Sequence, residues 1–159
     1  MKNFPTRIAA LSGAAILAVV GLTACGSDDD GGSAGGGEAG EIAFLMPDRA
    51  STRYEEQDSP LFKEKVAELC ADCKVLYQNA DSDPAKQQQQ VESMIAQGVK
   101  VIVLDPVDSK AAASMVTQAQ GADIPIVTYD RPVTDVPADF YVSFDNEAIG
   151  RSIAESLVE

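Results

Sequence analysis

The sequence predicts an α/β fold built on a doubly wound parallel sheet. Short apolar runs rich in β-branched residues alternate with amphipathic stretches of helical spacing, which is the pattern of successive βαβ units. The strongest strand is the run VKVIVL at 99–104, whose continuous hydrophobicity is typical of a strand buried on both faces. The best-delimited helix runs from Pro84 to Gln97, because Asp83 is a favoured cap, Pro84 suits a first turn and Gly98 favours an end.

The remaining elements follow in order along the chain. Apolar runs at 42–46, 74–77, 126–128 and 140–143 predict further strands, and Pro47 closes the first of them. Apolar residues at helical spacing predict helices at 61–69, 109–120 and 147–158, and Gly121 closes the second of these. The stretch from Glu41 onward is long enough for one domain.

The first 24 residues are predicted to be an export signal. Lys2 and Arg7 precede an apolar run from 8 to 24, and Cys25 follows the small residues that end this run. This arrangement resembles the bacterial lipobox, in which cleavage exposes the cysteine and its thiol carries diacylglycerol. We therefore expect residues 1–24 to be a lipoprotein signal peptide and Cys25 to carry an acyl lipid. The alternative is an uncleaved membrane anchor, for which the run lies at the short limit.

Residues 25–40 are predicted to form a disordered linker. They are rich in glycine and contain three consecutive aspartates at 28–30, so they cannot bury a core. The whole chain has a net charge of −13. Because nucleic-acid binding needs lysine and arginine on phosphates, this charge argues against nucleic acid as a partner. It also argues against contact with anionic lipid beyond the acyl anchor.

Acidic residues follow the predicted strands. Since parallel strands place their carboxyl ends at one edge of the sheet, and such sheets bind ligands at that edge, we expect a rim of carboxylates there. Its members are Asp48, Asp81, Asp105, Asp130 and Asp145, joined by Arg49, Arg53 and Arg131. Carboxylates accept hydrogen bonds from hydroxyls and guanidinium groups donate them, so the rim suits a polyhydroxylated ligand. Aspartate also favours caps and loops, which is the alternative explanation for Asp83, Asp108 and Asp145.

The sequence also resembles a known family. The segments Tyr129-Asp130-Arg131 and 139–147, with Gly150, resemble the amino-terminal lobe of type I periplasmic sugar-binding proteins, especially the D-xylose-binding components of ABC importers. The likeness covers 41–159 and includes the pair Arg53-Tyr54, the glutamines at 87–90 and the tripeptide at 97–99.

The resemblance implies particular roles for residues at the rim. Asp130 and Arg131 would bind the sugar directly, and Arg53 of the first loop would join them. Tyr54 stands where the family has a tryptophan, and this chain contains no tryptophan. Asp48 is a further candidate ligand, and Asp145 is a candidate for the site or the hinge.

The resemblance also implies a domain organisation. Residues 41–145 would form the first sugar-binding lobe, and residues 146–159 would be the first helix of a second lobe. The chain is therefore expected to end shortly after the first hinge crossing. We then expect Ile149, Ile153 and Leu157 to lack a complete packing partner.

The predicted function is that of an extracytoplasmic solute-binding lipoprotein. It would be anchored by lipid on the outer face of the cell membrane, in the periplasm or at the cell surface. It would capture a xylose-like monosaccharide and deliver it to the permease of an ABC importer. The alternative is a sugar-sensing receptor lipoprotein that feeds a signalling partner. Both hypotheses predict the same lobe.

Enzyme, cofactor and metal functions have little support in the sequence. The phosphate-binding patterns G-x-G-x-x-G and G-x-x-x-x-G-K-[ST] are absent, and without histidine there is no Ser-His-Asp or Cys-His arrangement. Cys70 and Cys73 form a C-x-x-C motif, but zinc would need two more ligands and redox motifs usually open a helix rather than close one. A local disulfide in an exported protein is the favoured interpretation.

Overall fold

The computed structural model describes residues 39–158. The predicted signal peptide, Cys25 and the linker as far as residue 38 lie outside the described residues. The described part contains a five-stranded sheet in the order β2-β1-β3-β4-β5, and every neighbouring pair of strands is parallel. With helices on both faces, this sheet confirms the predicted α/β fold.

The elements correspond closely to the predicted ones. The strands are β1 (Glu41–Met46), β2 (Lys74–Asn79), β3 (Val101–Leu104), β4 (Ile126–Tyr129) and β5 (Phe140–Val142). The helices are α1 (Ser59–Leu69), α2 (Pro84–Gln97), α3 (Ala113–Gly121) and α4 (Asn146–Ser156). A short π-helical segment, η1 (Tyr54–Asp58), leads directly into α1 and was not predicted.

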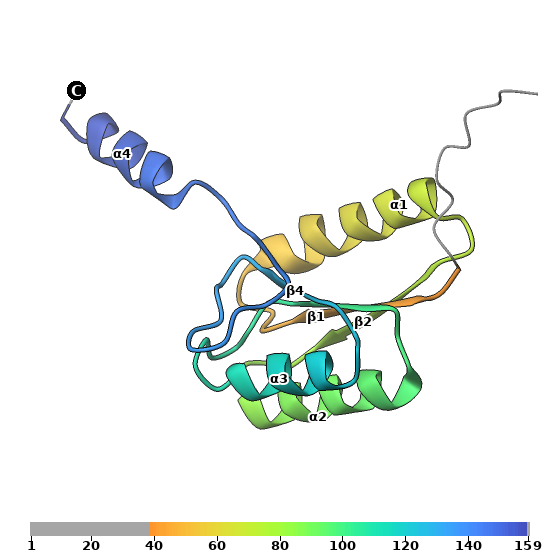
Figure 1. Cartoon of the computed structure of the whole chain (residues 1–159). Helices are drawn as coiled ribbons and strands as arrows, with labels where there is room; N and C mark the ends of the chain where they lie inside the picture. The colour runs from red at the N-terminus through yellow and green to blue at the C-terminus, as the bar shows by residue number, and fades with distance from the viewer. Residues whose placement is uncertain (1–38, 159) are drawn as a thin grey trace, which may run out of the picture. The chain divides into compact units, whose positions relative to one another are not determined.

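The sheet separates two apolar layers of unequal size. Helix α1 lies over one face, and α2 and α3 lie side by side over the other (Figure 1). Because successive side chains of a strand point to opposite faces, Leu45 of β1 joins the larger core under α2 and α3, whereas Phe44 and Met46 face α1. Phe44 stacks on Phe62 of α1 with ring centroids 4.3 Å apart. The α1 side is thus the thinner of the two cores.

Helix α2 begins and ends where its caps require. The Asp83 carboxylate accepts hydrogen bonds from the backbone amides of Ala85 and Lys86 at 2.8 and 3.2 Å. Gly98 ends the helix in the left-handed conformation at φ 70°, which glycine adopts without strain. The Val99 amide still donates to the α2 carbonyl of Met94 at 3.3 Å, so β3 starts at Val101, two residues later than predicted.

Two further boundaries differ from the prediction. Helix α3 starts at Ala113 rather than 109, because the Asp108 carboxylate accepts from the amides of Lys110 and Ala111 and holds a turn there. Strand β3 is only half buried on one side, since α1 alone covers that face. The sequence pattern suggested full burial of this strand on both faces.

Helix α4 has an exposed apolar face. Ile149, Ile153 and Leu157 are 46%, 57% and 80% exposed. The prediction that these side chains lack a complete packing partner is confirmed. Among residues 39–158, every helix is too short or too polar to span a bilayer.

The Asp83 cap should contribute measurably to stability. Replacing Asp83 by alanine removes two hydrogen bonds to the first turn of α2, and should lower the free energy of unfolding by about 1 kcal/mol. Denaturant titration of the protein measures this loss. Asp83→Asn is the matched control, because asparagine caps as well as aspartate and should keep stability within a few tenths of a kcal/mol. Equal stability of the alanine and asparagine variants would contradict the assignment.

Candidate functional site

Five polar side chains meet beyond the carboxyl ends of β1 and β4. The Arg53 Nη2 atom donates to the Asp130 Oδ2 atom at 2.8 Å, and the Tyr54 hydroxyl donates to the same oxygen at 2.9 Å. The Arg131 Nη2 atom lies 3.4 Å from the Tyr54 hydroxyl and 3.4 Å from the Asp48 Oδ2 atom. These five residues, called the rim cluster below, are Asp48, Arg53, Tyr54, Asp130 and Arg131.

The backbone of Asp130 is held in an unusual conformation. Its φ of 60° lies in the left-handed region, which residues other than glycine seldom adopt. Strand β5 and the residue after it fix this conformation: the Asp130 amide donates to the Val142 carbonyl at 2.9 Å, and its carbonyl accepts from Ser143 Oγ at 2.8 Å and the Tyr141 hydroxyl at 3.1 Å. Asp81 and Asp123 adopt the same region outside the rim cluster, so it is the contacts with β5, rather than φ alone, that fix Asp130 in the site.

Arg131 rests on a buried acid. Asp105 follows β3 and is fully buried, and its Oδ1 atom lies 3.8 Å from the Arg131 Nε atom. Within residues 39–158, neither carboxylate oxygen of Asp105 has a hydrogen-bond partner. The Arg131 Nη1 atom also donates to the Pro106 carbonyl at 3.2 Å. The guanidinium is therefore held from below by the segment that follows β3.

Burial and charge shift the pKa values in this region. Burial raises the pKa of Asp105 to about 7, against the opposing charge of Arg131, and the nearby charge of Asp130 raises it further. Burial also raises the pKa of Tyr54, as do the charge of Asp105 and the hydrogen bond to Asp130. Burial works to lower the pKa of Arg131, but the charge of Asp105 and the bond to Asp48 outweigh it, so that pKa is raised. Arg131 and Tyr54 thus keep their protons at neutral pH.

Arg53 joins the rim cluster to two other parts of the chain. Its guanidinium lies 5.0 Å from the ring centroid of Tyr54 and 4.9 Å from that of Phe144, which are cation–π distances. Its Nε atom also pairs with Asp58 at 3.2 Å. Burial opposes the charge of Arg53, but Asp130 and Asp58 outweigh burial and raise its pKa. Arg53 therefore stays charged and connects η1 with the segment that follows β5.

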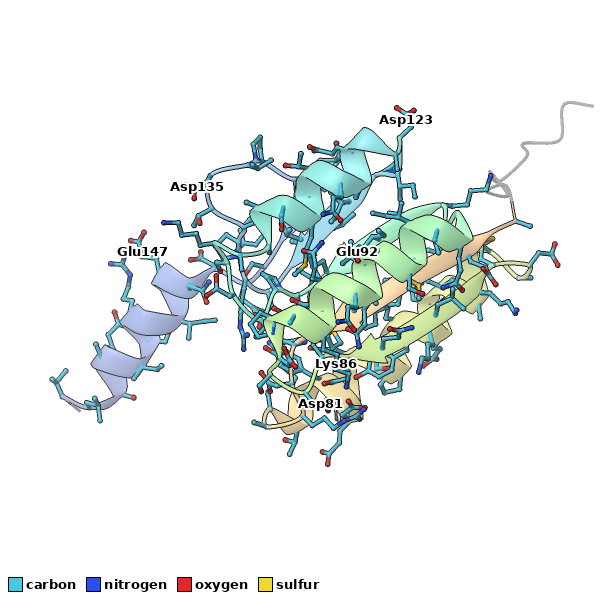
Figure 2. The ribbon with its side chains drawn as sticks, turned by 90° about the horizontal axis from the view of Figure 1, so that it is seen from below. Asp81, Lys86, Glu92, Asp123, Asp135 and Glu147 are labelled. Atoms are coloured by element: carbon cyan, nitrogen blue, oxygen red, sulfur yellow. A yellow bond between two sulfur atoms is a disulfide. The ribbon has the colours of Figure 1, made fainter. Side chains whose placement is uncertain are left out.

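Other acids predicted at the rim have different surroundings. The Asp145 carboxylate accepts from the Ala148 amide at 2.9 Å and caps α4. Asp81 pairs with Lys86 and with Arg49, whose Nε atom lies 3.0 Å away, in an exposed group beside α2 (Figure 2). Asp145 and Asp81 thus contact other partners, Asp83 caps α2, and Asp108 holds the turn that precedes α3.

Tyr54 has a different geometry from a stacking aromatic. Its side chain is buried at 3% exposure, and it presents its hydroxyl to the rim cluster rather than an open ring face. Cys70 and Cys73 are joined in a disulfide at the end of α1, the pairing favoured by the sequence.

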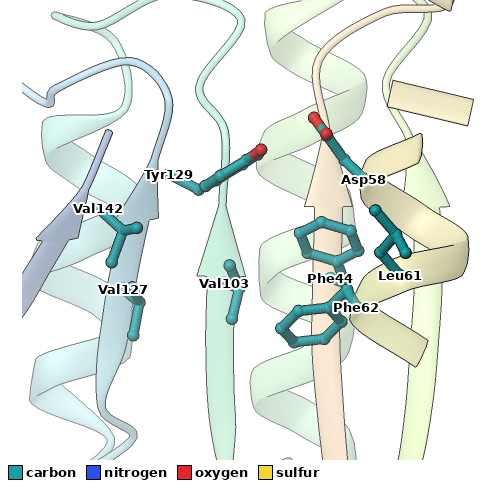
Figure 3. A pocket seen from close by; sticks show the side chains of 8 residues that line it. All are labelled: Phe44, Asp58, Leu61, Phe62, Val103, Val127, Tyr129 and Val142. Carbon is teal, nitrogen blue, oxygen red and sulfur yellow. The ribbon is translucent and has the colours of Figure 1, made fainter. Parts of the chain in front are cut away.

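An apolar cavity of about 460 Å³ lies below the rim on the α1 face of the sheet. Figure 3 shows Val103, Val127 and Val142 lining it from three strands, with Tyr129 and Asp58 directing their polar atoms toward one another above. Burial and a hydrogen bond to Asp58 raise the pKa of Tyr129. The cavity walls are almost wholly apolar, so the polar cluster, rather than this cavity, suits a polyhydroxylated ligand.

The sequence placed Asp105 among the rim carboxylates without a more specific role, and assigned no role to Asp58 or Phe144. Asp105 carried a signal, because it follows the most hydrophobic strand directly, where a buried carboxylate is unusual. Asp58 and Phe144 carried none, since their contacts with Arg53 depend on the π-helical turn and on the path of the chain after β5.

The comparisons with known proteins identify the family. Residues 42–159 match the periplasmic binding protein domain family, and the chain belongs to that family. It is 34% identical over 119 residues to the D-xylose-binding periplasmic protein of Escherichia coli K12, covering 75% of this chain and 35% of that protein. It is 32% identical over 118 residues to the protein of the same name from Haemophilus influenzae, covering 74% and 35%. The chain thus spans about a third of the length of these relatives.

Solved structures agree with this assignment. A carbohydrate transporter solute-binding protein from Chloroflexus aurantiacus, in complex with D-glucose, superposes with a TM-score of 0.66 at 33% identity, covering 74% of this chain and 34% of that one. An ABC transporter solute-binding protein from Mycobacterium smegmatis with bound glycerol gives 0.62 at 33% identity, covering 71% and 38%. These likenesses confirm the predicted resemblance to periplasmic sugar-binding proteins.

The buried carboxyl of Asp105 should make stability depend on pH. Because its folded pKa of about 7 lies above its ordinary 3.8, the folded protein holds this proton more tightly than the unfolded chain. The resulting stabilisation is complete below pH 4 and is lost as the pH rises to 7, on the order of 3–4 kcal/mol. Asp105→Asn should remove this dependence and gain stability relative to wild type between pH 4 and 8, as measured by guanidinium denaturation. Parallel pH curves for the two proteins would contradict the assignment.

Proposed function

We propose that the rim cluster binds a monosaccharide, and that the protein is an exported solute-binding lipoprotein that delivers this sugar to an ABC importer. The observation that carries the proposal is the alternation of acids and arginines around Tyr54 at the carboxyl edge of the sheet. Such an edge is where open α/β sheets bind ligands, and the relatives bind sugars according to their names.

The geometry suits hydroxyl groups. Both hydrogen bonds from Arg53 and Tyr54 use the Oδ2 atom of Asp130, so among the described residues Oδ1 is left to accept from a sugar hydroxyl. The Arg131 side chain is 38% exposed, and among residues 39–158 only one of its two Nη1 N–H groups has an acceptor, the Pro106 carbonyl, so the other is left to donate to a sugar hydroxyl. Asp48 holds Arg131 from one side and is a weaker candidate for direct contact. Asp145, the cap of α4, is a candidate for the hinge rather than for the sugar.

Xylose is the proposed ligand because two of the relatives carry that sugar in their names. Other relatives are named for ribose or for multiple sugars, at 33% and 30% identity. The rim cluster would contact hydroxyl groups on only one side of the sugar ring. In this proposal residues 41–145 form the first lobe, residues 146–159 begin a second lobe, and the sugar is enclosed between the two.

Delivery to an importer is favoured by the relatives described as ABC transporter solute-binding proteins. A sensor is the second candidate, since another relative, 30% identical over 123 residues, is named a multiple sugar-binding periplasmic receptor. Neighbouring genes discriminate the two: a permease and an ATPase support import, whereas a histidine kinase supports sensing.

Asp130 should be required for sugar binding. Asp130→Asn keeps the left-handed backbone, which asparagine tolerates, but removes the charge that faces Arg53. We expect D-xylose affinity in the full-length protein to fall by about 2 kcal/mol or more, roughly thirtyfold, in isothermal titration calorimetry.

Asp81→Asn is the matched control for this variant. Asp81 lies at the same edge with a similar φ of 53°, but its partners are Arg49 and Lys86 outside the rim cluster. Its loss should leave sugar affinity within a factor of two. Unchanged affinity in the Asp130 variant would remove Asp130 from the site.

Cys25 should determine processing and attachment to the membrane. Cys25→Ala should leave the precursor uncleaved and without lipid, because the thiol that receives diacylglycerol is missing. Immunoblotting for precursor size and metabolic labelling with a radioactive fatty acid measure the two effects. Normal cleavage of the variant would contradict the lipoprotein proposal and leave sugar binding untouched.

A further inference from the structure

Asp105 is the one rim acid that a ligand cannot reach. Its side chain has no exposed surface, whereas Arg131 above it is 38% exposed. Within residues 39–158 no group has good hydrogen-bond geometry to either carboxylate oxygen, although the Tyr54 hydroxyl is near enough to lower the pKa of Asp105. Burying a carboxylate with so few partners costs free energy. The guanidinium of Arg131, at 3.8 Å, is the charge that compensates it most directly.

The main chain around Asp105 is rigid. The Asp105 amide donates to the Leu45 carbonyl at 3.0 Å, and the Asp105 carbonyl accepts from the Gln87 side chain at 2.8 Å. The same Gln87 side chain accepts from the Val107 amide at 2.8 Å and is itself fully buried. A buried amide on α2 thus clamps residues 105–107 and fixes where the Asp105 carboxylate and the Pro106 carbonyl point.

Arg131 is therefore bounded on several sides by fixed acceptors. Pro106 and Asp105 lie below it, and Asp48 and the Tyr54 hydroxyl lie beside it. We propose that Asp105 is a positioning residue: its carboxylate orients the Arg131 guanidinium toward the sugar without touching the sugar itself. This inference rests on the proposed sugar-binding function of the rim cluster.

The proposal implies that sugar affinity depends on pH. Burial raises the pKa of Asp105 to about 7, so its charge is lost just below neutral pH, and Arg131 then keeps Asp48 beside it but loses the charge of the carboxylate below it. Gln87, which faces Asp105 from α2, does not titrate. The chain contains no histidine to obscure the effect. The charged and titratable groups that act on Asp105 are Arg53 and Tyr54 around η1 and Asp130 and Arg131 after β4. Asp48 after β1 contacts Arg131 rather than Asp105.

The test measures D-xylose, D-ribose and D-glucose binding to the full-length protein by calorimetry between pH 5.5 and 8.5. Wild-type affinity for the best of these sugars should weaken about fivefold or more as the pH falls through 7. Asp105→Asn should bind at every pH with the weaker, acidic affinity of the wild type. A variant that keeps the wild-type pH profile would overturn the proposal.

A matched control separates this effect from a general loss of an acid. Asp123→Asn makes the same chemical change at an exposed residue with φ 56°, before β4 at the other end of the sheet (Figure 2). It should retain both the wild-type affinity and its pH profile. A flat profile in this control would also overturn the assignment to Asp105.

A second measurement does not require sugar. The nitrogen NMR signal of Arg131 Nε should shift with a midpoint near pH 7 in the wild type and stay constant in Asp105→Asn. If this shift is present but none of the three sugars binds, the proposed function fails while the positioning of Arg131 stands. If sugar binds but the chemical shift of Arg131 Nε does not change with pH, the positioning role of Asp105 fails and the proposed function stands.

Discussion

Two arginines and the acids around them hold the carboxyl edge of this sheet together. Arg53 pairs with Asp58 and Asp130, and Arg131 lies against Asp48 and the fully buried Asp105. Neither the acids nor the arginines could be buried without the others, because burying an isolated ion costs more free energy than the whole net stability of a domain. The acids are therefore the reason that the arginines can be partly buried, and the arginines are the reason that Asp105 can be fully buried. A preorganised set of donors and acceptors results, at the edge where the strands end.

The fold supplies the rigidity that this arrangement needs. Successive side chains of β1, β3 and β4 alternate between two packed layers, which fixes the register of each strand. The last residue of each strand therefore has a defined position at the edge of the sheet. Polar groups then secure the loops: Gln87 clamps the residues after β3, and β5 clamps the backbone of Asp130. These contacts within the chain order the loops, which lowers the conformational entropy that binding must oppose.

The sequence was sufficient to predict the sheet, the helices and the edge at which Asp130 and Arg131 lie, because apolar periodicity and local caps determine these features. It was not sufficient to predict the partners. Asp130 bonds to Arg53, which lies 77 residues away in sequence, rather than to the adjacent Arg131. Such pairing depends on the three-dimensional path of the chain, as does the left-handed backbone of Asp130. The position of Asp105 directly after β3 is consistent with its burial, but nothing in the sequence predicts that, within the part of the chain that the structure describes, Arg131 is its main partner.

The uneven cover of the sheet has a consequence for handling the protein. Within residues 39–158 strand β5 lies at the edge of the sheet, and its side chains Phe140, Tyr141 and Val142 are each at least half exposed. Its outer backbone groups and apolar side chains form a template on which another chain can add a strand. Residues 39–158 by themselves are thus expected to self-associate through β5 as the protein concentration rises. A charged residue or a proline substituted into β5 would restore solubility.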